Sequence, residues 1–257
     1  MSKITQKFQN NKSLIAYLVA GDPSIEKTGD YIIAMHKAGV DLIEIGIPFS
    51  DPSADGPVNQ RGMIRALQNG ITVEKLFTMV KRVRAAGVDI PLLFMSYCNP
   101  IFHFGYDKFF AKCQESGIDG VIIPDVPYEE LKEYSDYANN YGIEYITLIA
   151  PTSSERVEIL AKQAKGFIYL ISSLGVTGAR TKINNNINDL AKKIKEFTDI
   201  PVAIGFGIST PEQAREMTRT ADGCVIGSAI VKIIEEYKEN ADEKLFEFVF
   251  NVKKMMN

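Results

Sequence analysis

The sequence predicts an α/β fold in which eight parallel β-strands and the helices between them close into a (β/α)8 barrel. Eight short apolar runs, rich in residues that favour strands, recur along the chain, and a segment with apolar residues at helical spacing follows each run. This alternation implies parallel strands joined by crossover helices. The length of 257 residues suits one such barrel, so we expect a single TIM-barrel domain over residues 1–257.

The predicted strands consist almost entirely of apolar residues, which is typical of parallel strands that are buried on both faces. They cover residues 14–21, 41–48, 91–97, 120–125, 145–150, 167–172, 201–206 and 223–228. Three other helices are expected around this frame. A short helix at residues 2–10 would close the bottom of the barrel, and a helix at 58–69 would follow the second strand, with Pro57 in its first turn. The last helix, at 242–256, would pack on the exterior.

The composition argues against nucleic acid, membrane and metal as partners. Basic and acidic residues number 29 and 32, so no basic excess is available to neutralise phosphates. No apolar run has the length of a membrane span, and the polar N-terminal segment lacks the apolar core of a signal peptide. The three cysteines, Cys98, Cys113 and Cys224, lack CxxC spacing and indicate reduced thiols in a cytoplasmic protein. With His36 and His103 as the two histidines, a three-His zinc site cannot be built, and no metal site is expected.

Two carboxylates stand out in the stretch EIGIPFSDPSADGP, which begins in the second predicted strand. Side chains alternate across a strand, so Ile43, Ile45 and Ile47 share the face that suits the surrounding helices. Glu44 then points into the barrel, where burial raises the pKa of a carboxyl and lets it give and take protons near neutrality. The residue pattern leaves other roles open. Glu44 could belong to a salt bridge or an edge strand, and Asp55 could be the N-cap of the next helix.

The glycines after the last predicted strands point to a bound anion. The sequences GFGIS and GSAIVK place Gly207, Gly227 and Ser228 in the loops after strands seven and eight, where many barrels bind phosphate through backbone N–H groups. The sequence LGVTGAR after strand six supplies another glycine, Gly178. The alternative is that these glycines serve only tight turns. We expect an enzyme with a phosphorylated substrate.

The stretch EIGIPFSDPSADGP resembles the signature of the tryptophan synthase alpha chain family. The resemblance continues in the same order through GDP, MSYCNP, PDVPYEE, YLISSLGVTGAR, GFGIS and GSAIVKII, and it covers nearly the whole chain. One departure is Ser53, where the family more often has an apolar residue, so the packing of this loop on a partner is in question. Tyr17 stands where another aromatic residue is common.

The resemblance implies a carbon–carbon lyase of tryptophan biosynthesis. Its reaction is the retro-aldol cleavage of indole-3-glycerol phosphate to indole and D-glyceraldehyde 3-phosphate. Protonation of the indole C3 carbon makes the ring a leaving group, and the side-chain hydroxyl loses its proton as the bond breaks. By resemblance, Glu44 carries out both proton transfers, and Asp55 accepts a hydrogen bond from the indole N–H and stabilises its positive charge.

Further roles follow from the resemblance alone. The positions that match substrate-binding residues are Tyr17, Met95, Tyr97 and Leu148 around the indole, Tyr169 at the glycerol phosphate end, Phe206 in GFGIS, Thr177 in a lid segment, and Gly178, Gly207, Gly227 and Ser228 at the phosphate. The family works as an α2β2 heterotetramer, in which a beta subunit carrying pyridoxal phosphate receives the indole. No cofactor is expected in this chain, and the loop after strand two is expected to face the partner.

Several alternatives compete with this interpretation. An indole-glycerol phosphate synthase or an aldolase would use a lysine on a strand, and none of the eight predicted strands contains one. A standalone lyase that releases free indole remains open, and so does a non-catalytic activator of a beta subunit.

Overall fold

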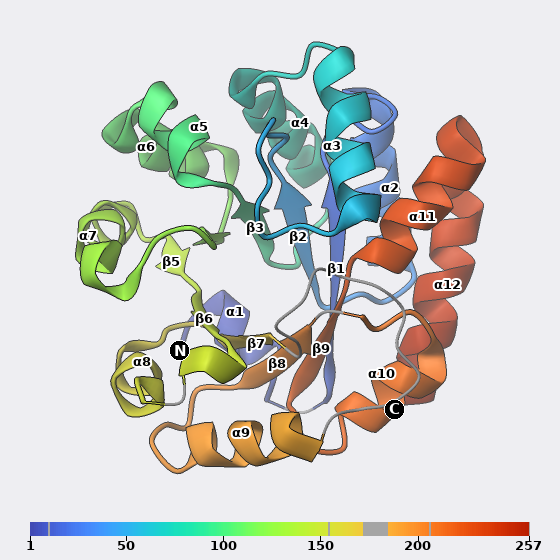
Figure 1. Ribbon diagram of the computed structural model, residues 1–257. Helices are drawn as coiled ribbons and strands as arrows, with labels where there is room; N and C mark the ends of the chain where they lie inside the picture. Colours follow the sequence, from blue (N-terminus) through green and yellow to red (C-terminus); the bar gives the residue numbers. More distant parts are fainter. Residues whose placement is uncertain (10, 154, 172–184, 206, 257) are drawn as a thin grey trace.

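The computed structural model describes residues 1–9, 11–153, 155–171, 185–205 and 207–256, and within them a parallel sheet forms the centre of the molecule (Figure 1). The strand order in this sheet is β5-β4-β3-β2-β1-β9-β8-β7-β6. Its strands are β1 (Ser13–Val19), β2 (Leu42–Gly46), β3 (Leu92–Met95), β4 (Gly120–Ile122), β5 (Glu144–Tyr145), β6 (Thr147–Ile149), β7 (Ile168–Ile171), β8 (Val202–Gly205) and β9 (Gly223–Ile226).

The two ends of this strand order meet in the fifth predicted strand, 145–150. Its first part, β5, pairs with β4, whereas its second part, β6, pairs with β7. Only Ile146 separates them, and its N–H donates to the carbonyl oxygen of Val121 at 2.9 Å. The predicted (β/α)8 TIM barrel is therefore confirmed, with one correction. The fifth strand is interrupted at Ile146, because each half pairs with a different neighbour.

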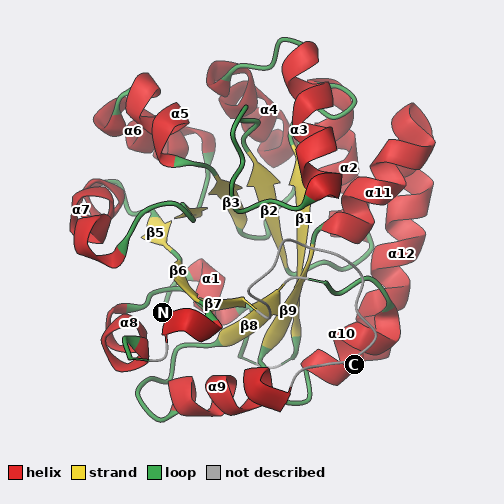
Figure 2. Cartoon of the chain, viewed as in Figure 1, coloured by secondary structure: helices red, strands yellow, loops and turns green. Residues whose placement is uncertain are grey.

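The helices are α1 (Lys3–Gln6), α2 (Ile25–Lys37), α3 (Pro57–Gln68), α4 (Val73–Ala85), α5 (Cys98–Phe104), α6 (Tyr106–Ser116), α7 (Leu131–Asn140), α8 (Val157–Gln163), α9 (Asn185–Lys195), α10 (Pro211–Met217), α11 (Ser228–Tyr237) and α12 (Ala241–Met256). The helices other than α1 surround the strands in a ring, and α1 lies inside that ring in the view of Figure 2. The extra helix after strand two and the last helix are confirmed as α3 and α12. The N-terminal helix α1 is shorter than the predicted 2–10. In the described ranges, no helix is both long and apolar enough to cross a membrane.

Two apolar cores lie on opposite faces of the strands. Ile43 and Ile45 of β2 belong to the outer core between sheet and helices. Leu42, on the other face of the same strand, belongs to a second core inside the barrel, which Ile4 of α1 joins at the N-terminal end. The alternation along β2 therefore directs Glu44 into the barrel, as predicted, where it is completely buried.

Candidate active site

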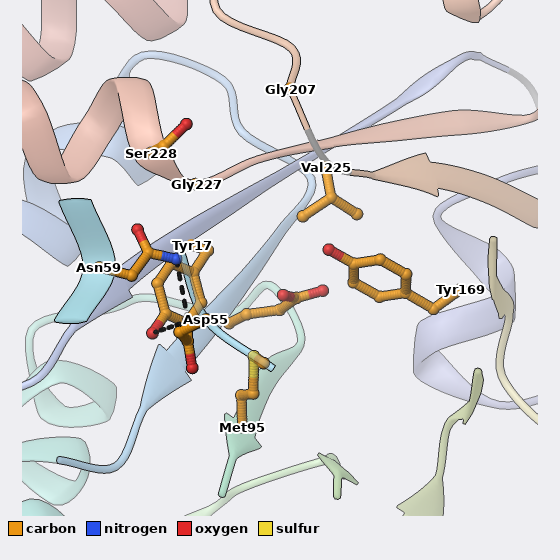
Figure 3. Close-up of a pocket in the computed structure, with 10 residues that line it drawn as sticks. Tyr17, Asp55, Asn59, Met95, Tyr169, Gly207, Val225, Gly227 and Ser228 are labelled. Carbon is orange, nitrogen blue, oxygen red and sulfur yellow. Dashed lines mark hydrogen bonds between the residues drawn. The ribbon is translucent and has the colours of Figure 1, made fainter. Parts of the chain in front are cut away.

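A small pocket opens at the C-terminal ends of the strands, the end that carries the active site in barrels of this type (Figure 3). Its lining consists of Tyr17, Glu44, Asp55, Asn59, Met95, Tyr169, Gly207, Val225, Gly227 and Ser228. Eight of these ten residues belong to the predicted site, and they come from segments spread over most of the chain. The barrel therefore brings together side chains that are far apart in the sequence.

Glu44 is held in the wall of the barrel between two paired strands. Its backbone lies opposite Tyr17 of β1 and Leu93 of β3, so β2 is not an edge strand. The side chain is 0% exposed, and within the described residues neither carboxyl oxygen has a hydrogen-bond partner. The salt-bridge and edge-strand alternatives are therefore wrong. Burial, with the nearby charge of Asp55, raises the pKa of Glu44 to about 8, so the group holds its proton near neutrality.

Asp55 is buried in the same pocket but is surrounded by donors. Tyr97 Oη donates to Oδ2 at 2.6 Å, and Asn59 Nδ2 donates to Oδ1 at 3.0 Å. Tyr17 Oη adds a longer bond to Oδ1 at 3.5 Å. Burial raises the pKa of Asp55, and these three hydrogen bonds limit the rise by favouring the anion. The N-cap alternative is wrong, because Gly56 occupies the N-cap of α3.

The side chains of Tyr17 and Tyr169 lie against Gly46 and Gly205 and occupy much of the pocket. A Cβ atom on Gly46 would lie 2.5 Å from Tyr17 Oη, and one on Gly205 would lie 2.5 Å from Tyr169 Oη. Strands β2 and β8 therefore leave room for these hydroxyls only because each ends in glycine. The cavity that these side chains leave has a volume of about 30 Å³.

The opposite side of the pocket offers backbone donors. Gly227 is the N-cap of α11 and has no side chain to cap it, whereas the Thr210 side chain caps α10. The first N–H groups of a helix lack partners within the helix, and the helix dipole favours an anion there. Gly207 has a φ of +85°, in the left-handed region that glycine adopts easily. Ser228 begins α11, so its hydroxyl lies beside the same N–H groups.

Two predicted residues lie outside this lining. Tyr97 contacts Asp55 and accepts a hydrogen bond from Ala54 N at 3.0 Å, so it supports the loop that carries the carboxylate. Leu148 lines a neighbouring cavity of about 230 Å³ together with Ile171.

The other three predicted residues, Thr177, Gly178 and Phe206, lie outside the described residues. Within the described part of the chain, no group of three or more His, Cys, Asp or Glu side chains could hold a metal ion.

The prediction missed Val225 and Asn59. Val225 follows the alternation of β9, which would have placed it inside the barrel with Gly227. Asn59 lies four residues after Asp55, in the first turn of the predicted helix. This spacing was the only feature of the sequence that could have identified Asn59 as a residue of the pocket.

The sequence matches known proteins over nearly its whole length. A family model described as the tryptophan synthase alpha chain matches residues 4–257. This chain belongs to that family. The tryptophan synthase alpha chain of Lacticaseibacillus casei is 43% identical over 253 residues, which are 98% of this chain and 95% of the relative. That of Lactiplantibacillus plantarum is 47% identical over 239 residues, which are 93% and 90% of the two chains.

The fold agrees with solved structures of the tryptophan synthase alpha chain family. A chain from the tryptophan synthase complex of Pyrococcus furiosus superposes with a TM-score of 0.87 at 37% identity, covering 94% of this chain and 98% of that one. Family membership confirms the resemblance and the barrel fold. It also confirms the expected function, a lyase of tryptophan biosynthesis that cleaves indole-3-glycerol phosphate.

Proposed function

We propose that Glu44 and Asp55 are the catalytic residues for the cleavage of indole-3-glycerol phosphate to indole and D-glyceraldehyde 3-phosphate. The observation that supports this most strongly is the state of Glu44. It is a fully buried carboxyl without a hydrogen-bond partner among the described residues, and its pKa is raised to about 8. A structural carboxylate would be paired at this depth, because an unpaired buried polar group destabilises the fold.

In the proposed mechanism, one carboxyl carries both proton transfers. Glu44 in its acid form gives a proton to the indole C3 carbon, and the ring becomes cationic. The bond from C3 to the neighbouring side-chain carbon then breaks, and its electron pair returns to the ring. The hydroxyl on that side-chain carbon loses its proton to the Glu44 carboxylate as the aldehyde forms. Glu44 therefore ends as it began, and the reaction needs no other acid or base.

Asp55 would stabilise the cationic ring. A carboxylate offers about four lone-pair positions. The hydrogen bonds from Tyr97, Asn59 and Tyr17 use three of them, so one remains for the indole N–H. These donors favour the anionic form that this role requires, against the burial that raises the pKa of Asp55. This preorganisation is the kind of electrostatic effect that lowers the energy of a charged intermediate.

We further propose that Gly207, Gly227 and Ser228 hold the phosphate, together with Gly178 from outside the described residues. The N-terminus of α11, where the N-cap Gly227 has no side chain to bond the first N–H groups, supports this placement. Tyr169 would then lie near the glycerol phosphate.

The same proposal keeps the other predicted positions as substrate contacts. Tyr17, Met95, Tyr97 and Leu148 would lie around the ring, and Phe206 and Thr177 would complete the site.

We propose a beta subunit as the partner, in an α2β2 heterotetramer whose pyridoxal phosphate belongs to that subunit. The similar Pyrococcus furiosus structure is that of a tryptophan synthase complex, which supports a partner. Phe102 on α5 is 67% exposed near the rim of the barrel, and Ser53 is exposed in the loop after β2. This chain itself would need no cofactor.

Two further assignments belong to the proposal. The chain would act in the cytoplasm, which the free thiols of Cys98, Cys113 and Cys224 support. Residues 1–257 would form one domain, since a single barrel spans the described ranges.

The test is an assay of indole release from indole-3-glycerol phosphate, with and without a beta subunit. We expect cleavage that the beta subunit accelerates, near-complete loss in Glu44→Gln with substrate binding retained, and a loss of roughly 10²-fold or more in Asp55→Asn. Full speed without the beta subunit would favour the standalone lyase. No cleavage in either condition would favour the non-catalytic activator.

A further inference from the structure

We propose that Asn59 determines specificity for the substrate's tail. Its amide nitrogen orients Asp55, and its amide oxygen accepts a hydrogen bond from the tail hydroxyl that does not react. This inference rests on the proposed cleavage of indole-3-glycerol phosphate and adds a recognition contact to it.

The orientation of the Asn59 amide follows from its neighbour. Asp55 Oδ1 can only accept a hydrogen bond, so the group that faces it at 3.0 Å must be the Asn59 Nδ2 donor. Figure 3 shows the nitrogen turned toward Asp55 and the oxygen turned away from it. The opposite assignment would place two acceptors against each other in a buried site.

The oxygen is left without a partner in an enclosed position. Asn59 is 8% exposed, and among the described residues nothing donates to its Oδ1 atom. A buried carbonyl oxygen without a donor destabilises the protein by about 1–3 kcal/mol. Since Asn59 lines the pocket, a donor on the substrate could supply the missing hydrogen bond.

The position of Asn59 indicates which group of the substrate donates this hydrogen bond. The indole N–H belongs to Asp55 in the proposed mechanism, and the phosphate has no proton donor to offer near neutrality. In Figure 3, Asn59 lies between Asp55 and the turn of Gly227 and Ser228, which is where the tail would pass from ring to phosphate. The tail has two hydroxyls. One gives its proton to Glu44, so the other, on the adjacent carbon, is the donor left for Asn59.

The experiment compares the substrate with an analogue that lacks only the non-reacting hydroxyl. We would measure kcat/KM for cleavage of both compounds by the wild type, by Asn59→Leu and by Gln68→Leu. Leucine is close to asparagine in size but has neither donor nor acceptor. Gln68 is exposed at the end of the same helix and is the matched control. The wild type and Gln68→Leu should prefer the hydroxyl-bearing compound by about tenfold or more, and Asn59→Leu should lose most of this preference.

Each outcome decides the matter. If Asn59→Leu lowers cleavage of both compounds by the same factor, Asn59 acts only through Asp55 and the proposed contact is refuted. Equal wild-type rates on both compounds refute it as well, even if the variant does not fold. If the wild type cleaves neither compound, the proposed function fails. The affinities of the two compounds, measured by calorimetry, then test the Asn59 contact separately.

Discussion

At the scale of single residues, two carboxyl groups in one pocket have different surroundings. Glu44 is completely buried and has no hydrogen-bond donor among the described residues, so burial favours its neutral form. Asp55 is almost as buried, but it accepts hydrogen bonds from Tyr97, Asn59 and Tyr17, which favour its anion. Pairs of acids whose surroundings separate their pKa values are typical of acid and base roles in catalysis.

This difference predicts a bell-shaped dependence of kcat/KM on pH. Below about pH 8, Glu44 keeps the proton that starts the reaction, and activity should fall as pH rises through that value. On the acid side, activity should fall as Asp55 is protonated. This decline should lie at a higher pH than the ordinary pKa of an aspartate, because burial raises the pKa of Asp55. Steady-state cleavage assays from acid to alkaline pH would measure both limbs as properties of the coupled pair. A rate that stays level well above pH 8 would contradict the role of Glu44.

At the scale of elements, the barrel positions its tyrosines by ending two strands in glycine. The ring of Tyr169 crosses above Gly205 of β8, as Tyr17 crosses above Gly46 of β2. Strand β2 has five residues and β8 has four, so the last inward position of each strand lies at the pocket and helps to determine its shape.

We expect Gly205→Ala to displace Tyr169 and to lower the free energy of unfolding by about 1–3 kcal/mol through overpacking. The new methyl group would meet Tyr169 Oη at 2.5 Å and Cε1 at 2.6 Å. Unfolding by urea would measure the change. In a Tyr169→Leu background the same alanine should destabilise the protein much less, since the ring is gone. An equal loss in both backgrounds would show that the methyl group disturbs something other than Tyr169.

At the scale of the whole molecule, a network of charges joins both ends of the pocket. Arg65 on α3 donates to Asp22 Oδ2 at 2.7 Å and Oδ1 at 2.9 Å, and to Glu235 Oε1 on α11 at 2.9 Å. Arg61 also binds Glu235, at 2.8 Å. Helix α3 follows the Asp55 loop, and α11 begins at the proposed phosphate site. The two helices lie side by side (Figure 1), so the network ties the Asp55 side of the pocket to the side at the start of α11.

Arg65→Met should destabilise the fold far more than Arg61→Met. The Asp22 side chain is only 2% exposed, and loss of Arg65 would leave its charge buried and unpaired, at a cost of about 3 kcal/mol or more. Arg61 is 50% exposed, and its partner Glu235 keeps Arg65, so its loss should cost less than about 1 kcal/mol. Urea unfolding of the two variants provides the comparison. If both variants lost the same free energy of unfolding, burial of Asp22 would not be the cause of the effect of Arg65→Met.

Local patterns predicted most of the barrel and part of the pocket. The alternation of β2 placed Glu44 inside, and the helix after Pro57 is observed as α3. The same reasoning proposed Asp55 as an N-cap and did not find the break at Ile146. Both depend on neighbours distant in sequence, since Tyr97 binds Asp55 and the fifth strand changes its pairing partner.

The sequence by itself determined the barrel, the inward direction of Glu44 and the family, because strand and helix periods and motif order can be read along the chain. Only the tertiary structure decided which side chains meet. It joined Tyr17, Asp55, Asn59 and Tyr97 in one set of hydrogen bonds, and it left Glu44 without a partner among the described residues. The reason is physical. Burial and hydrogen bonding depend on distances across the closed sheet, and separation along the chain does not determine them.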